Sequence, residues 1–135
     1  MNQNKTETII ERFFAVLLDR GIDAALDLVT EDASFEAQGP SSVPIYRRFK
    51  GHEGVREFIG ILQNMFDTEK FEIRQAVEQA EVAFAYGYMQ HRVIKTNKVF
   101  CSEFALYRRT QNGRISTYKM FEDTAALAIA HQNTS

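Results

Sequence analysis

The sequence is poor in several residue types: it has no tryptophan, one cysteine, two prolines and three histidines among 135 residues. Because Cys101 stands alone, no internal disulfide can form, which fits a reducing, cytoplasmic setting. The three scattered histidines lack the spacing of a zinc site, so no metal is expected. No apolar run approaches the roughly 20 residues that cross a bilayer, and residues 1–7 are polar, unlike a signal peptide. We therefore expect a cytoplasmic protein without a membrane partner.

Net charge is also small, since 16 basic and 18 acidic residues leave −2. This balance offers no field to attract phosphates, so nucleic acid is not expected as a partner. No phosphate-binding glycine loop, CxxC pair or nucleophile elbow occurs in the sequence, and no cofactor is expected. What the chain does have is 44% hydrophobic residues, including eleven Phe and five Tyr, enough for an aromatic-rich core. We expect one domain over residues 1–135, with an ordered core over about 5–131.

The first half of the chain has helical periodicity. Asn4 and Glu7 have the spacing of a capping box at the start of the first helix, and Phe35 is expected to open a short strand. Residues 39–44, rich in Gly, Pro and Ser, are predicted to form a loop over the edge of the domain. Apolar spacing predicts three helices, over about 6–19, from about 23 and over about 55–66.

After Thr68 the apolar period becomes two, which is typical of strands. Thr96-Asn97 and Asn112-Gly113 are predicted hairpin turns, because Asn and Gly tolerate positive φ. Asp123 is predicted to cap a last helix over residues 124–131. The four predicted strands cover about 71–78, 82–94, 99–109 and 115–122.

Helices followed by a long meander and an Asp-capped last helix form a pattern that resembles the SnoaL-like branch of the nuclear transport factor 2-like superfamily, which includes the ketosteroid isomerases. The resemblance implies an α+β fold: a cone in which three N-terminal helices pack on a curved antiparallel sheet with an internal pocket. It also implies a small-molecule pocket protein, because the superfamily contains isomerases, cyclases, epoxide hydrolases and dehydratases beside purely binding or scaffolding members. It rests on DRGIDAALDLVTEDASFE (19–36), FKGHEGVREFI (49–59), NGRI (112–115) and FEDTAAL (121–127).

The residues behind the known chemistries of this superfamily are replaced in this chain. Ketosteroid isomerases use a Tyr on the first helix and two Asp on the sheet, and the matching positions look like Phe14, Ala37 and Ala105. SnoaL-like and limonene-epoxide-hydrolase-like enzymes carry a carboxylate on the last strand, where this chain has Met120. The resemblance therefore implies a pocket whose polar groups lie elsewhere.

Register arithmetic suggests where those groups lie. If Asn112-Gly113 is a two-residue turn, Glu103 lies opposite Glu122, and a two-residue turn at Thr96-Asn97 places Gln90 opposite Glu103. Two buried carboxylates in cross-strand contact would share one proton, which suits general acid–base catalysis, so Glu103 and Glu122 are the candidate catalytic residues. The predicted pocket residues are Phe14, Phe35, Phe58, Tyr88, Gln90, Ala105, Tyr107, Tyr118 and Met120.

Two alternatives stay open. Glu103 can equally lie on a solvent face or in an oligomer interface, and a one-residue slip in either turn places Met89 and His91 in the pocket in place of Tyr88 and Gln90. The protein is either an enzyme that performs cofactor-independent acid–base chemistry (isomerase, cyclase or hydrolase/dehydratase) on an apolar oxygenated metabolite, or a ligand-binding or dimeric assembly module. A homodimer is expected through the outer sheet face, predicted to carry Phe104, Leu106, Ile115 and Phe121.

Overall fold

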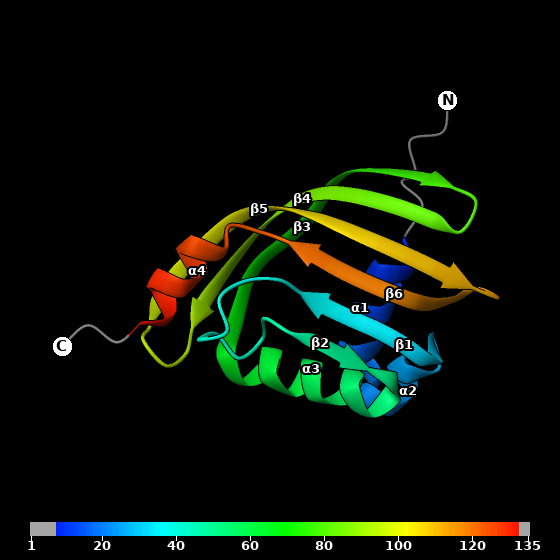
Figure 1. The fold of residues 1–135 in the computed structure, drawn as a ribbon, viewed down its shortest axis with the longest axis horizontal. Helices are drawn as coiled ribbons and strands as arrows, with labels where there is room; N and C mark the ends of the chain where they lie inside the picture. Colours follow the sequence, from blue (N-terminus) through cyan, green and yellow to red (C-terminus); the bar gives the residue numbers. More distant parts are fainter. Residues whose placement is uncertain (1–7, 133–135) are drawn as a thin grey trace.

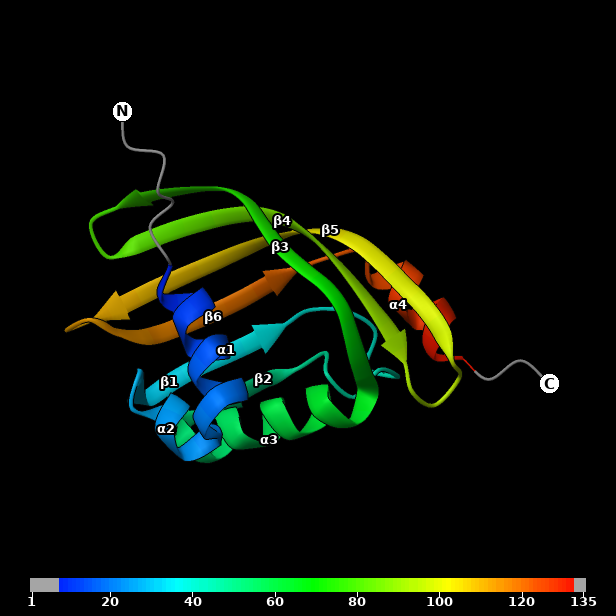
Figure 2. The same ribbon diagram turned by 180° about the vertical axis from the view of Figure 1, so that it is seen from behind.

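The computed structural model describes residues 8–132, which form four helices and one six-stranded sheet. The helices are α1 (Ile9–Arg20), α2 (Ile22–Leu26), α3 (Gly51–Met65) and α4 (Thr124–His131). The strands are β1 (Val29–Ala37), β2 (Arg48–Lys50), β3 (Phe66–Gln79), β4 (Val82–Val93), β5 (Lys98–Gln111) and β6 (Arg114–Phe121). The sheet bends around α1 and α3, and α4 lies beside β5 (Figures 1 and 2). This is the expected cone-shaped α+β fold.

The strand order is β2-β1-β6-β5-β4-β3, and all neighbours are antiparallel except β1 and β6. The sheet is therefore mixed, not wholly antiparallel as expected. No hairpin joins β1 to β6, because four other strands and α3 lie between them in the chain, so no turn dictates their relative direction. The parallel pairing places Phe35 beside Tyr118. Strand β2 was not predicted, since three residues are too few to display a period.

Both ends of the described chain carry well-formed helix caps. At α1 the Glu11 amide donates to the Thr8 hydroxyl at 3.1 Å, and the Thr8 amide donates to the Glu11 carboxylate at 3.0 Å. The expected capping pair, Asn4 with Glu7, lies outside the described residues. At α4 the Asp123 carboxylate accepts from the Ala126 amide at 3.0 Å, so the prediction of this helix and its cap is confirmed.

The register of the sheet differs from the predicted one in two places. The connection between β4 and β5 is four residues long, because Val93 pairs with Lys98; Gln90 therefore lies opposite Cys101, not Glu103. A bulge at Ser116 of β6, opposite Arg109 and Thr110, shifts the two strands by one residue, so Leu106, not Ala105, pairs with Met120. The predicted contact between Glu103 and Glu122 is wrong for this reason.

Because of this shift, the β5 side chains that were predicted to face outward lie on the concave side of the sheet, and those predicted to face the pocket lie on the outer side. Phe104 and Leu106 are buried on the concave side, as is Ile115 on β6, and only Phe121 of the predicted outer set is exposed. The loop predicted over residues 39–44 does not simply lie over the edge of the domain. Val43 within it is buried, as are Ile45 and Tyr46 directly after it. None of the helices within residues 8–132 is long and apolar enough to cross a membrane.

Candidate functional site

A cavity of about 720 Å³ lies between the concave face of the sheet and helices α1 and α3. Its walls are mostly apolar, with Phe14 from α1, Phe58 and Leu62 from α3, and Met89 and Met120 from the sheet. Solvent-exposed lining residues mark its mouth between α1, α3 and the start of β3; they are Ala15, Leu18, Gln63, Asp67 and Thr68. A concave, largely apolar cavity with few polar groups is the usual form of a small-molecule site.

Tyr118 is the best-fixed polar residue of the cavity. Its ring stacks on Phe35, with centroids 4.8 Å apart and planes 10° apart, because the two residues are neighbours in the parallel β1–β6 pair. Phe58 and Phe14 contact the ring edge-on at 5.5 and 6.5 Å. Within residues 8–132 no hydrogen bond links the Tyr118 hydroxyl to another group of the protein. This hydroxyl is therefore held by its ring and available to a ligand.

Glu122 supplies the carboxylate of the cavity. It follows the end of β6, directly before the cap of α4, and it points inward because Met120, two residues earlier, also faces the cavity. Its Oε2 atom accepts a hydrogen bond of 2.7 Å from the Tyr46 hydroxyl. Glu122, with the Tyr46 hydroxyl bonded to it, and Tyr118 thus both line the cavity.

Tyr46 reaches Glu122 because the segment between β1 and β2 folds inward. The Val43 amide donates to the Pro40 carbonyl at 3.1 Å, and the Tyr46 amide donates to the Val43 carbonyl at 3.0 Å. Gly39 lies directly against the Tyr46 ring: a Cβ atom on Gly39 would lie 2.4 Å from its Cδ2. The glycine therefore provides the room that the ring occupies.

Burial shifts the pKa values of Glu122, Tyr46 and Tyr118. Desolvation raises the pKa of Glu122 above its ordinary value, and the hydrogen bond from Tyr46 opposes part of that rise. Burial also raises the pKa of Tyr46 and of Tyr118, and the negative charge of Glu122 adds to both shifts. Both tyrosines therefore remain protonated, and Glu122 holds a proton more readily than an ordinary carboxyl group does.

His91 is a second polar group of the cavity, on the inward face of β4. Its Nδ1 atom lies 3.0 Å from the Thr68 hydroxyl oxygen, and its ring stacks between Phe66 and Phe100 at 4.6 and 6.2 Å. The side chain is only 8% exposed. Burial lowers the pKa of His91 to about 4, so the imidazole is neutral at physiological pH.

The structure brings together only part of the predicted site. Of the residues predicted to line the pocket, Phe14, Phe58, Tyr118 and Met120 do so, together with the candidate catalytic Glu122. Phe35 lies behind Tyr118 in the core. The remaining predicted residues lie on the outer face of the sheet, which corrects their expected position; they are Tyr88, Gln90, Glu103, Ala105 and Tyr107.

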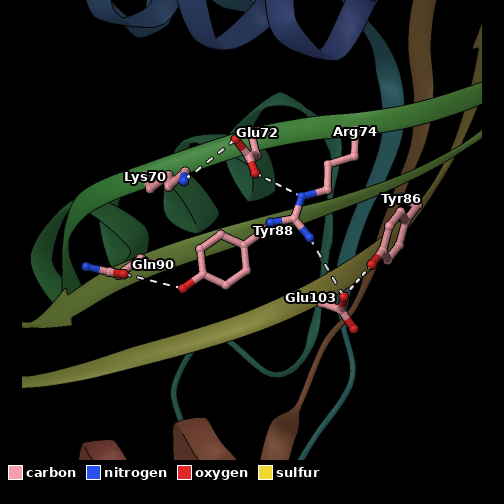
Figure 3. A network of polar contacts seen from close by, with 7 residues as sticks. All are labelled: Lys70, Glu72, Arg74, Tyr86, Tyr88, Gln90 and Glu103. Atoms are coloured by element: carbon pink, nitrogen blue, oxygen red, sulfur yellow. Dashed lines mark hydrogen bonds and ion pairs between the residues drawn. The ribbon is translucent and has the colours of Figure 1, made fainter.

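Figure 3 shows this outer face, where Glu103 belongs to a solvent-exposed network. Its carboxylate accepts a hydrogen bond from Tyr86 and lies 3.8 Å from the Arg74 guanidinium, which also pairs with Glu72 at 2.9 Å (Figure 3). The Tyr88 hydroxyl donates to Gln90 at 3.3 Å on the same face. Such exposed ion pairs contribute little stability. Glu103 therefore lies on the opposite side of the sheet from the cavity, among solvent-exposed partners.

The cavity residues that the prediction missed differ in how clearly the sequence indicates them. Met89 and His91 belong to the alternative register, and they do line the cavity. Tyr46 was not predicted as a site residue, although the apolar Val43 and Ile45 interrupt the Gly/Pro/Ser stretch and indicate that it turns inward. In the described part of the chain, no group of three His, Cys, Asp or Glu residues could hold a metal ion.

Comparison with known proteins supports the same fold. The family model of the SnoaL-like domain matches residues 10–118. An NTF2-like protein from Burkholderia xenovorans LB400 is 22% identical with a TM-score of 0.84, covering 92% of this chain and 93% of that one. Among curated proteins no match was found.

Two further solved structures share the fold and contain ligands. TerC, co-crystallised with polyporic acid, is 16% identical with a TM-score of 0.79, over 93% of this chain and 96% of that one. A protein from Catenulispora acidiphila DSM 44928 with a ketosteroid isomerase-like fold, in complex with trimethylamine, is 13% identical with a TM-score of 0.75, over 94% of each chain. At these identities the likeness establishes the fold alone.

Proposed function

The chain belongs to the SnoaL-like domain family, and we propose that it binds an apolar, oxygenated small molecule in its cavity and transfers a proton there through Glu122. The observation that carries the proposal is a half-buried carboxylate in an apolar cavity, in hydrogen-bond contact with Tyr46. Glu122 lies beyond the segment that matches the family model, so its role rests on geometry and not on the family.

Glu122 is the proposed general base, and Tyr118 is the proposed hydrogen-bond donor. The ionised carboxylate takes a proton from a carbon next to a ligand carbonyl, and the C–H electron pair moves to the carbonyl oxygen. The Tyr118 hydroxyl donates a hydrogen bond to this oxygen as negative charge builds up on it. Where a C=C bond is conjugated with the enolate, Glu122 then returns the proton at the far carbon of that system, which completes an isomerisation. The abstraction itself needs no cofactor, and it is the step that isomerases, cyclases and dehydratases share.

Tyr46 is the proposed positioning residue. Its hydroxyl donates to one carboxylate oxygen of Glu122 and leaves the other free for the ligand. The hydrogen bond also stabilises the ionised form of Glu122, which a base must have before it accepts a proton. Tyr46 is only 6% exposed, so water competes little for this contact.

The test uses a generic ketone because the proposed step does not depend on the natural ligand. NMR follows the exchange of the α-protons of 2-tetralone in D₂O with each purified variant. Glu122→Gln should lower the protein-dependent exchange rate by about 100-fold or more, the range for loss of a general base. Glu103→Gln, a matched change on the outer face, should leave the rate unchanged. Equal rates for the two variants would refute the proposal.

The outer face of the sheet supports a second proposal, a homodimer. It exposes large apolar side chains on β4 and β6, including Phe84 (50% exposed) and Phe121 (42% exposed). Phe84 packs against Tyr107 with ring centroids 5.1 Å apart, so the patch is continuous across β4 and β5. Exposed apolar patches of this kind commonly form subunit interfaces. Phe84→Glu should convert a dimer into a monomer in sedimentation velocity, and a wild-type monomer would refute the dimer.

The cytoplasm is the proposed location. Cys101 is an exposed free thiol, and such a side chain persists most readily in a reducing compartment. A thiol-reactive reagent applied to intact cells and then to lysates measures its state directly. Cys101 recovered in oxidised form from intact cells would contradict this location.

A further inference from the structure

We infer that His91 binds an uncharged oxygen group of the ligand, in addition to the oxygen group that contacts Glu122 and Tyr118. We also infer that the cavity selects uncharged ligands over anionic ones. The inference rests on the proposed ligand cavity and adds the class of molecule that fills it. It depends on three observations: the orientation of the imidazole, its charge state, and the charges of the residues that line the cavity.

The His91 ring is oriented by contacts on its faces and on one nitrogen. Phe66 and Phe100 stack on it with interplanar angles of 23° and 24°. Thr68, its register partner on β3, engages Nδ1 at 3.0 Å. Among the groups of residues 8–132, none is hydrogen-bonded to Nε2. One ring nitrogen of a fixed imidazole in the cavity wall is therefore available to a ligand.

The imidazole is neutral, which determines what it can bind. Burial holds its pKa at about 4, and no carboxylate forms an ion pair with it in the described chain. Of the acidic residues of the cavity, Asp67 neighbours Thr68 at the mouth, and Glu122 is bonded to Tyr46. A neutral imidazole offers one donor or one acceptor, which suits a hydroxyl or a carbonyl group.

The lining of the cavity disfavours anions. It contains three acidic residues, Glu11, Asp67 and Glu122, and no Lys or Arg among the residues that line it. A ligand carboxylate would lose its hydration without gaining a cation, which is costly in an apolar site. The ligand expected from these charges has one oxygen group toward Glu122 and Tyr118, a second toward His91, and an apolar body between them.

His91 could instead be a packing residue, because it lies between two phenylalanine rings. The two roles separate in His91→Phe, which keeps an aromatic ring between Phe66 and Phe100 but removes both nitrogens. His91→Gln keeps a neutral hydrogen-bonding group. Tyr88→Phe serves as the matched control, because it removes a hydrogen-bonding group from the opposite face of the same strand.

The experiment titrates the protein with 2-naphthol and with 2-naphthoate, which share a ring system and differ in charge at neutral pH. NMR reads the methyl groups of Met89 and Met120 in the cavity wall and the ring nitrogens of His91. We expect 2-naphthol to shift all three residues and to bind at least about tenfold more tightly than 2-naphthoate. We expect His91→Phe to bind 2-naphthol about tenfold more weakly than wild type, because one hydrogen bond is lost. His91→Gln and Tyr88→Phe should keep most of the affinity for 2-naphthol.

Each contrary outcome identifies what fails. If 2-naphthoate binds as tightly as 2-naphthol, or if His91→Phe binds 2-naphthol as tightly as Tyr88→Phe does, the inference is overturned. If affinity falls only in Glu122→Gln, the inference also fails while the proposed function stands. If neither probe shifts Met89 and Met120, both fail. Should His91→Phe not fold, an unchanged His91 nitrogen signal in wild-type protein saturated with 2-naphthol overturns the inference.

Discussion

Tyr46→Phe tests the central contact of the site with the removal of one oxygen atom. The variant leaves the Glu122 carboxylate half-buried without its 2.7 Å donor. A hydrogen bond to a charged group contributes about 2 kcal/mol, and the loss should therefore lower the free energy of unfolding by about that amount. For a domain of this length, about 2 kcal/mol corresponds to a fall in Tm of roughly 7 °C.

The destabilisation in Tyr46→Phe should depend on pH. Burial raises the pKa of Glu122 in the folded state, so folding favours its protonated form, and stability falls as pH rises from the ordinary value through the raised one. The Tyr46 hydroxyl limits this loss because it stabilises the ionised form. The gap in stability between wild type and Tyr46→Phe should therefore be small at or below the ordinary Glu pKa of about 4 and grow as pH rises through the raised pKa.

The assay is thermal or chemical unfolding of both proteins across this pH range. Tyr118→Phe is the matched control: it also removes one tyrosine hydroxyl from the cavity, but no hydrogen bond to a described group is lost with it. Its stability should follow wild type at every pH. A gap that does not change with pH, or an equal loss in Tyr118→Phe, would refute the reasoning about Glu122.

Three further changes test other parts of the structure. Folding disfavours protonation of His91, whose pKa is about 4 instead of 6.5, so stability should fall by up to about 3 kcal/mol as pH drops through this window; His91→Phe should lack that fall in unfolding titrations. Gly39→Ala places a Cβ atom 2.4 Å from the Tyr46 ring and should cost about 1–3 kcal/mol in urea unfolding, whereas an unaffected variant would contradict the packing. Asp123→Ala removes the acceptor of the Ala126 amide and should cost about 1 kcal/mol, with Asp123→Asn close to wild type; equal losses would contradict the capping role.

The sequence was informative where a signal is local. Apolar spacing identified α1 and α3, and the Asp123 cap identified α4 at its observed bounds, because helix periodicity and caps depend on residues within one or two turns. Strands β3 to β6 were found as well, although β3 begins five residues earlier than predicted, at Phe66 instead of Phe71. The exposed residues at the start of β3 have no alternating pattern that would indicate a strand.

The site was harder to predict because it depends on register. One extra residue on β6, Ser116, reverses the facing of β5 against β6, and nothing in the sequence marks this residue as a bulge. Glu103 was therefore expected in the pocket and lies on the outer face. Tyr46 was missed for another reason: its 76-residue separation from Glu122 is bridged by tertiary folding that no local pattern describes.

The pH dependence of 2-tetralone exchange tests most directly the claim that Glu122 is the base of the cavity. The protein-dependent rate should rise as Glu122 loses its proton, with a midpoint equal to the pKa of the Glu122 side chain measured by carboxyl NMR. That midpoint should move upward in Tyr46→Phe, and the rise should disappear in Glu122→Gln. A profile that is the same in wild type and Glu122→Gln would contradict the account.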